Sequence, residues 1–270
     1  MSSFRSRIKA WVPPAAVGML RRTARRGVYF SGNFQTWQEA QSKAEGYDQG
    51  AILDRVLNAT REVCQGRAVF ERDGALFDQK TPPYALLAAV MRVLATQKPI
   101  HILDFGGALG SSFFQCRDWI RGIGSVAWSV VEQANFVEAG RAHIHEDGLH
   151  FFKSMKECIA SNGAADLILF SGVLQYVPDP WSILSEAVTY GPRMLVIDRT
   201  PFHPANSERI RIQHVPTSLG RASYPVRILS ESSLLSLLEK EYMNIGSFPA
   251  LDGMISGAHF KGFIFDRRSQ

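Results

Sequence analysis

The chain has 270 residues, of which 46% are apolar, so it can bury the core of one or two globular domains. No stretch approaches the roughly 18 consecutive apolar residues that predict a membrane-spanning helix, and no apolar run followed by a small-residue cleavage site predicts a cleaved signal peptide. The formal charge is +5, but residues 1–27 alone hold seven basic residues and no acid, which leaves residues 28–270 at −2 and gives that part no electrostatic reason to bind nucleic acid.

The three cysteines, Cys64, Cys116 and Cys158, are far apart and fit no metal or redox spacing. We therefore expect reduced thiols in a cytoplasmic protein.

Residues 1–27 form a basic N-terminal arm. Its apolar stretch, residues 11–20, lies between basic residues, and Pro13 and Pro14 prevent one continuous helix. Two short amphipathic pieces are expected, which would make a peripheral contact with an anionic membrane at its inner face. The alternative is a solvated basic tail without a partner.

Residues 28–97 are predicted to form a mostly helical cap. Thr36 and Glu39 have the spacing of a capping box, which satisfies free amides at a helix start. A helical apolar stripe follows over residues 52–63, and Asp73-Gly74 between two short apolar runs predicts a tight hairpin. Pro83 then opens another apolar helix.

Residues 98–270 alternate apolar strands with helical stretches, which predicts an α/β domain with a parallel sheet covered on both faces. The expected strands are Ile100–Leu103, Val126–Val131, Leu149–Phe152, Leu167–Phe170 and Met194–Ile197. Two further runs, Tyr242–Phe248 and His259–Phe265, are too close together for a crossover helix and should pair antiparallel. A mostly parallel sheet with a reversed last strand resembles the Rossmann-like sheet of class I methyltransferases that use S-adenosylmethionine.

The first of these strands ends in the stretch ILDFGGALGS, residues 102–111. Gly106, Gly107 and Gly110 allow a sharp turn that brings the backbone close to a ligand, and Ser111 is expected to cap the helix over residues 112–121. The start of that helix favours an anion, which in S-adenosylmethionine is the methionine carboxylate, and Asp104 suits the ammonium beside it.

This turn has three other interpretations. A Walker phosphate loop would end in Gly-Lys-Ser/Thr, which is missing. A nicotinamide-binding loop would read GxGxxG, and Ala108 breaks that pattern. A purely structural strand-to-helix turn remains an alternative.

Glu132 ends the second strand, where a carboxylate can accept hydrogen bonds from both ribose hydroxyls of an adenosine cofactor; an ordinary exposed acid is the alternative. The candidate cofactor-binding set is completed by residues at or near other predicted strand ends: Gln133, Ser154, Ser171 and Gly172.

Residues 166–180 resemble the fourth-strand region of small-molecule methyltransferases, where a strand runs into a turn of the type VLEHVPDP. Gln175 and Tyr176 replace the common Glu-His pair, so the usual base is missing, although Tyr176 stays a catalytic candidate. Whether or not this region belongs to a methyltransferase, Pro178–Pro180 is expected to form a rigid turn that starts the next helix.

A narrower resemblance covers the chain from about residue 28 onward. The stretches YFSGNF (29–34), GYD (46–48), FERDG (70–74), VEQ (131–133), LQY (174–176) and DRTPF (198–202) are similar to a family of bacterial methyltransferases. Genes of this family lie beside surface-polysaccharide and lipopolysaccharide genes, and its methyltransferase assignment rests on the fold. The resemblance therefore implies the cofactor, S-adenosylmethionine, more strongly than the acceptor.

Residues 199–229 are too many for a plain connection and hold most of the candidates for the chemistry. His203 and His214 have the most suitable pKa for a general base, and Asp198 precedes the segment. Basic and hydroxyl side chains would bind an acidic glycan: Arg199, Arg209, Tyr224 and Arg227. Each of these could instead be a packing or surface residue.

No metal site is expected, because His143, His145 and His150 are better explained by an exposed helix end. The sequence as a whole predicts a methyltransferase that uses S-adenosylmethionine, with an oxygen of a cell-surface glycan precursor as acceptor. A non-catalytic module of the same fold that scaffolds glycan assembly is the main alternative, and a nicotinamide-dependent oxidoreductase is a further one.

Overall fold

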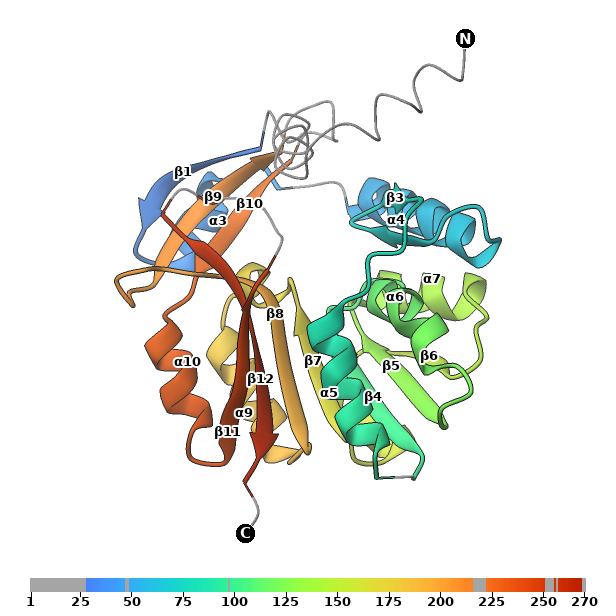
Figure 1. Cartoon of the computed structure of the whole chain (residues 1–270). Coiled ribbons are helices and arrows are strands. Elements are labelled where there is room, and N and C mark those ends of the chain that lie inside the picture. The colour runs from blue at the N-terminus through green and yellow to red at the C-terminus, as the bar shows by residue number, and fades with distance from the viewer. Residues whose placement is uncertain are drawn as a thin grey trace, which may run out of the picture.

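The computed structural model describes residues 28–46, 49–96, 98–215, 222–250, 255 and 257–268. The basic arm of residues 1–27 and the pair Tyr47-Asp48 lie outside the described residues, as do residues 216–221 of the segment that holds most catalytic candidates. Figure 1 shows one large sheet with helices on both sides and two smaller elements above its upper edge.

The large sheet has seven strands in the order β11-β12-β8-β7-β4-β5-β6. In chain order their bounds are β4 (Ile100–Phe105), β5 (Val126–Val131), β6 (Leu149–Phe152), β7 (Leu167–Ser171), β8 (Met194–Phe202), β11 (Tyr242–Pro249) and β12 (His259–Arg267). Strands β4 to β8 are parallel, whereas β12 is antiparallel to both β8 and β11. This arrangement confirms the predicted fold class, including its reversed strand.

Alternate residues of the sheet point into two separate cores. Ile102 and Val130 pack with helices α4 to α7, and Leu103 and Val131 pack with helices α8 to α10. The bounds are α4 (Gln49–Cys64), α5 (Tyr84–Leu94), α6 (Ser111–Ile120), α7 (Ala134–His143), α8 (Met155–Asn162), α9 (Pro180–Thr189) and α10 (Glu231–Leu238). Strands buried on both faces read as continuous apolar runs, which is why the sequence pattern predicts them well.

A second sheet of three strands was not predicted. It consists of β1 (Tyr29–Phe34), β9 (Arg209–Val215) and β10 (Ala222–Ile228), with β9 in the centre, and helix α3 (Trp37–Lys43) packs on it. Strand β8 is also longer than expected and runs to Phe202. The sequence pattern predicted no strand within residues 199–229, yet most of the described part of that segment is strand. This sheet covers the upper edge of the large sheet (Figure 1).

The other element above the large sheet is the hairpin of β2 (Phe70–Arg72) and β3 (Ala75–Phe77), next to α4. The predicted tight turn is confirmed: Asp73 and Gly74 both have positive φ angles, of 54° and 74°. At the start of α3 the expected cap is also present, since the Glu39 amide donates to Thr36 Oγ1 over 3.1 Å.

None of the helices among the described residues is both long enough and apolar enough to span a membrane.

Candidate functional site

The two central parallel strands, β4 and β7, define a crevice at the upper edge of the sheet. From β4 the chain continues to β5 and β6 on one side, and it then returns to β7 and β8 on the other side. Ligands of open α/β sheets bind at this kind of reversal, beyond the carboxyl ends of the strands. The turns after β4 and β7 are in contact here, because a Cβ added to Gly106 would lie 2.3 Å from Cγ2 of Val173.

The glycine-rich turn after β4 has an unusual backbone. Gly106, Ala108 and Gly110 all have positive φ, at 73°, 52° and 96°. Gly110 is the residue that precedes α6, and Ser111 is its first helical residue. The expectation that Ser111 caps this helix was therefore wrong. The capping position belongs to Gly110, whose φ of 96° only a glycine adopts without strain.

Asp104 lies underneath this turn and does not face the crevice. Its side chain is fully buried, Trp128 Nε1 donates to Oδ2 over 3.1 Å, and Oδ1 has no hydrogen-bond partner. Burial raises the pKa of this carboxyl to about 7. Gly107 packs directly on this carboxyl group, since an added Cβ would lie 2.6 Å from Asp104 Cγ. The contact of Asp104 with a ligand ammonium stays a prediction.

Glu132 follows β5 directly and reaches the glycine turn. Its Oε1 accepts a hydrogen bond from the Ala108 amide over 3.3 Å, and its Oε2 accepts one from the Gln133 amide over 2.7 Å. Partial burial raises the pKa of this carboxyl group. Each carboxylate oxygen accepts one backbone amide and keeps a further lone pair, so Glu132, next to the turn, suits a ligand that offers two hydroxyl donors.

The other predicted cofactor residues lie at the same edge of the sheet. Gln133 precedes α7, and Ser154 caps α8 after β6, where its hydroxyl accepts from the Glu157 amide over 3.1 Å. Ser171 ends β7 opposite Asp198 of β8, and the Gly172 amide donates to the Asp198 carbonyl over 3.0 Å. The structure therefore places Asp198 on the wall of the crevice.

Arg199 crosses the crevice from β8. Its φ of 55° is rare outside glycine, and Gln175 Nε2 donates to its carbonyl over 3.2 Å. The guanidinium lies over Gly172, where a Cβ would be 3.3 Å from Cζ, and it forms an ion pair of 3.2 Å with Asp73 of the β2–β3 turn. A strained residue held in this way at a ligand-binding edge is a candidate binding group.

Glu71 of β2 was not predicted as a site residue. Its side chain is 1% exposed, accepts a short hydrogen bond from the Ser111 hydroxyl and accepts one from the Gly74 amide over 3.0 Å. Burial raises its pKa. The sequence signal was an acid inside a short apolar strand next to a tight turn, but only the tertiary fold shows that this hairpin docks on the start of α6.

Tyr176 and Tyr224 are brought together at the rim of the crevice. Tyr176 lies in the short 3₁₀ helix η1 (Leu174–Tyr176), and its ring meets that of Tyr224 edge to face with centroids 5.6 Å apart. Gln213 connects them, since its Oε1 accepts from the Tyr176 hydroxyl over 3.2 Å and its Nε2 donates to the Tyr224 hydroxyl over 2.9 Å. These polar groups could bind hydroxyls of an acceptor.

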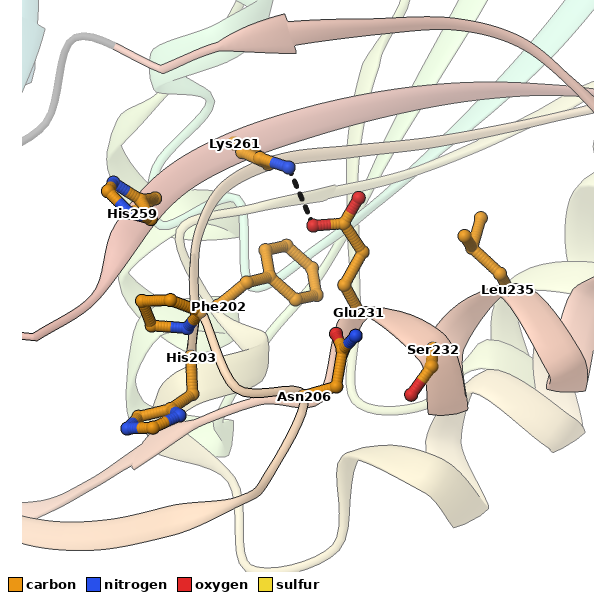
Figure 2. Close-up of a pocket in the computed structure, with 9 residues that line it drawn as sticks. Phe202, His203, Asn206, Glu231, Ser232, Leu235, His259 and Lys261 are labelled. Atoms are coloured by element: carbon orange, nitrogen blue, oxygen red, sulfur yellow. Dashed lines mark hydrogen bonds and ion pairs between the residues drawn. The ribbon is translucent and has the colours of Figure 1, made fainter.

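The two candidate histidines do not join this site. His214 packs on the face of the small sheet opposite to Gln213, where its ring stacks on Tyr29 at 4.4 Å and its Nε2 lies 2.7 Å from Ser31 Oγ. His203 borders a separate pocket of about 380 Å³ between the end of β8 and the start of α10 (Figure 2). In that pocket Lys261 and Glu231 form an ion pair of 2.6 Å.

The two remaining arginines are also elsewhere. Arg227 connects neighbouring elements: it forms an ion pair of 2.6 Å with Glu208, donates to the Pro178 carbonyl over 2.7 Å and lies over the ring of Trp37. Arg209 is exposed at the beginning of β9. Within the described residues no group of three or more His, Cys, Asp or Glu side chains is arranged to hold a metal ion.

Comparison with known proteins gives a distant structural similarity only. No family model matches the sequence, and the search of curated proteins gives no match. Among solved structures, the N-terminal domain of EvdMO1 with SAH and D-fucose has a TM-score of 0.45 and 17% identity, covering 82% of this chain and 100% of that one. The glycopeptide N-methyltransferase MtfA with sinefungin has a TM-score of 0.47 and 11% identity, covering 67% and 86%.

A third structure, magnesium protoporphyrin IX methyltransferase from Synechocystis PCC 6803 with SAM, has a TM-score of 0.43 and 13% identity, covering 68% of this chain and 79% of that one. Similarity at this level concerns the general arrangement of the sheet and carries no information about the acceptor.

Proposed function

We propose that the protein is a methyltransferase that uses S-adenosylmethionine and methylates an oxygen of a cell-surface glycan precursor in the cytoplasm. The observation that carries the cofactor proposal is the carboxylate of Glu132, which ends β5 and contacts the Ala108 amide of the glycine turn at 3.3 Å. A carboxylate in this position can accept both ribose hydroxyls, while the turn admits the rest of the ligand close to the backbone.

The residues present fit such a cofactor. Glu132 can accept hydroxyl donors in addition to, or in place of, the Ala108 and Gln133 amides. The three glycines let the turn pack closely on Val173, Asp104 and Leu149, with which added Cβ atoms would collide, and so leave the backbone of the turn without side chains at these positions. Ser171, half-buried at the end of β7, borders the same crevice. When bound, S-adenosylmethionine supplies an electrophilic methyl group on a sulfonium.

For the acceptor, the proposal assigns the rim of Tyr176, Gln213 and Tyr224 to hydroxyl recognition and Arg199 to an acidic group of the glycan. In this proposal Asp198 is the general base that removes the proton of the acceptor hydroxyl. Its Oδ1 accepts a hydrogen bond from the Arg199 amide over 2.8 Å. Asp198 replaces His203 and His214 as the preferred base, because it alone of the three lies beside β7 in the crevice. Support comes from this grouping and from the family resemblance.

The cofactor proposal is tested by calorimetry with S-adenosylhomocysteine and NAD. The wild type should bind the first and not the second. Glu132→Gln keeps the size of the side chain and removes its charge, so affinity for S-adenosylhomocysteine should fall by about 1.5–3 kcal/mol, the range for hydrogen bonds to a charged group. The control is Glu138→Gln on the exposed side of α7, which should bind normally. Binding of NAD, or full affinity in Glu132→Gln, would contradict the proposal.

The acceptor proposal is tested with S-adenosylmethionine labelled in its methyl group and an extract of cell-envelope glycans. O-methyl sugars should appear after acid hydrolysis, and EDTA should not prevent their formation. Asp198→Asn should lower the rate about 100-fold or more, as expected for the loss of a general base, without changing cofactor affinity. His203→Gln is the control and should keep the rate. Label in protein or in no product at all would exclude glycan methylation.

A further inference from the structure

The hairpin of β2 and β3 connects the two sides of the crevice. On one side, the Ser111 hydroxyl at the first residue of α6 donates to the Glu71 carboxylate. On the other side, Asp73 at the tip of the hairpin pairs with Arg199 at 3.2 Å. Since Ser111 follows β4 and Arg199 belongs to β8, these contacts hold the hairpin across the crevice, above the glycine turn. Figure 1 shows the hairpin and α4 above α6.

Glu71 brings a negative charge to a place that favours anions. Its side chain is 1% exposed, and no lysine or arginine is within ion-pair distance of it among the described residues. Its partners are the Ser111 hydroxyl and the Gly74 amide. A buried carboxylate without a paired cation is costly unless other groups stabilise it, and burial raises the pKa of Glu71. The hydrogen bonds from Ser111 and Gly74, the charge of Arg199 and the dipole at the start of α6 act in the opposite direction and favour the ionised carboxylate.

A bound amino-acid cofactor would need the same place. The methionine carboxylate of S-adenosylmethionine is expected at the start of the helix that follows the glycine turn. Two carboxylates cannot share one helix start, because like charges at contact distance repel each other strongly in a poorly solvated site.

We propose that Glu71 is an internal competitor of the cofactor: its carboxylate occupies the start of α6 in the free protein, and cofactor binding displaces it together with the hairpin. This inference rests on the proposed function. Its consequence is that the protein binds the amino-acid end of the cofactor more weakly than its own site would allow, because part of the binding energy opens the hairpin.

The test is calorimetry on the full chain with three probes: S-adenosylhomocysteine, its decarboxylated form, which keeps the ammonium, and 5′-methylthioadenosine, which lacks both charged groups. Glu71→Gln keeps the shape but removes the competing charge; its amide oxygen can still accept from the Gly74 amide, while its NH2 group donates to the Ser111 hydroxyl oxygen. Affinity for S-adenosylhomocysteine should rise about fivefold or more. Affinity for the other two probes should change less than about twofold, since neither brings a carboxylate.

The control is Asp118→Asn at the opposite end of α6, where Asp118 pairs with Lys80; it removes one charge from the same helix and should change no affinity. Weaker binding of S-adenosylhomocysteine and its decarboxylated form in Glu71→Gln would show instead that Glu71 binds the ammonium. Equal changes for all three probes, or none, would leave Glu71 a structural residue. A wild type that binds none of the probes would overturn the proposed function itself.

A second measurement does not depend on the variant. In wild-type protein, S-adenosylhomocysteine should speed up amide hydrogen exchange in residues 70–77 and slow it in residues 106–110. Slower exchange in both segments would mean that the hairpin closes on the cofactor, which contradicts displacement.

Discussion

Among the buried polar side chains, His101 shows how hydrogen bonds fix a protonation state. It is 5% exposed on β4, its Nδ1 lies 3.1 Å from the Gly163 carbonyl and its Nε2 lies 2.9 Å from Ser129 Oγ. The carbonyl can only accept, so Nδ1 carries the proton and Nε2 accepts from the serine. Burial lowers the pKa of this imidazole, and the neutral form is preferred in the folded protein.

Folding stability should therefore depend on pH through this residue. With the folded pKa below the unfolded value of about 6.5, the contribution of His101 is fully present above pH 6.5 and is lost as the pH falls below it. His101→Gln should cost about 1–3 kcal/mol at pH 8, because it removes buried hydrogen bonds, and less at pH 5. Urea unfolding at both pH values measures the difference. A larger penalty for His101→Gln at pH 5 than at pH 8 would contradict the assignment.

At the scale of single residues, the sequence predicts position along the chain better than the direction of a side chain. Asp104 lies one residue before the end of β4 and Glu132 directly follows β5, so both are close to the strand ends where they were predicted. However, Asp104 points under the turn, toward Trp128, whereas Glu132 points to the Ala108 amide. Which side a strand-end residue faces depends on packing, here on the indole of a neighbouring strand, and local patterns do not contain that information.

At the scale of elements, the glycine turn depends on two separate properties of its first glycine. Gly106 has a positive φ of 73°, and a Cβ on it would also collide with Val173 at 2.3 Å. Gly122, after α6, offers a matched comparison, since its φ is 77° and nothing lies within 4 Å of an added Cβ. The pair separates backbone strain from close packing of the two crevice turns.

Gly122→Ala should lower the free energy of unfolding only by the backbone strain, about 1–2 kcal/mol, and should keep the affinity for S-adenosylhomocysteine. Gly106→Ala should lower the free energy of unfolding by a further 1–3 kcal/mol, roughly the cost of overpacking. It should also bind S-adenosylhomocysteine at least about tenfold more weakly, because the collision with Val173 moves the turn. Thermal unfolding and calorimetry measure both quantities. Equal losses of stability and unchanged affinity in the two variants would show that the contact with Val173 is unimportant.

The two sheets differ in how far the sequence predicts them. Strands of the large sheet are continuous apolar runs between helices, and their parallel order follows from that alternation. The small sheet instead pairs Tyr29 with His214, which are far apart in the chain. Its strands mix polar and apolar residues, and β9 carries arginines at positions 209 and 211. Strand β9 does alternate polar and apolar residues over Arg209–Ile212, which is a strand signal, but this alternation does not show which distant strands it pairs with. The rim formed by Gln213 and Tyr224 could therefore not be predicted.

At the scale of the whole molecule, charge is divided between the arm and the rest of the chain. Residues 1–27 hold seven basic residues and no acid, while residues 28–270 sum to −2. The proposed glycan acceptors are assembled at the inner face of the membrane if they are linked to lipid. A basic arm with an apolar stretch would then bring the enzyme to its substrate, since each basic residue near an anionic leaflet contributes about 1 kcal/mol.

We therefore expect the full-length protein to float with vesicles that contain anionic lipid, and a variant that starts at Val28 to remain at the bottom of the gradient. Raising the salt from 0.1 M to about 0.5 M should release the full-length protein, because the attraction acts within a Debye length that shrinks with ionic strength. Vesicles of neutral lipid serve as the control. Equal flotation of the two proteins would place any membrane contact in residues 28–270, and flotation of neither would identify the arm as a solvated tail.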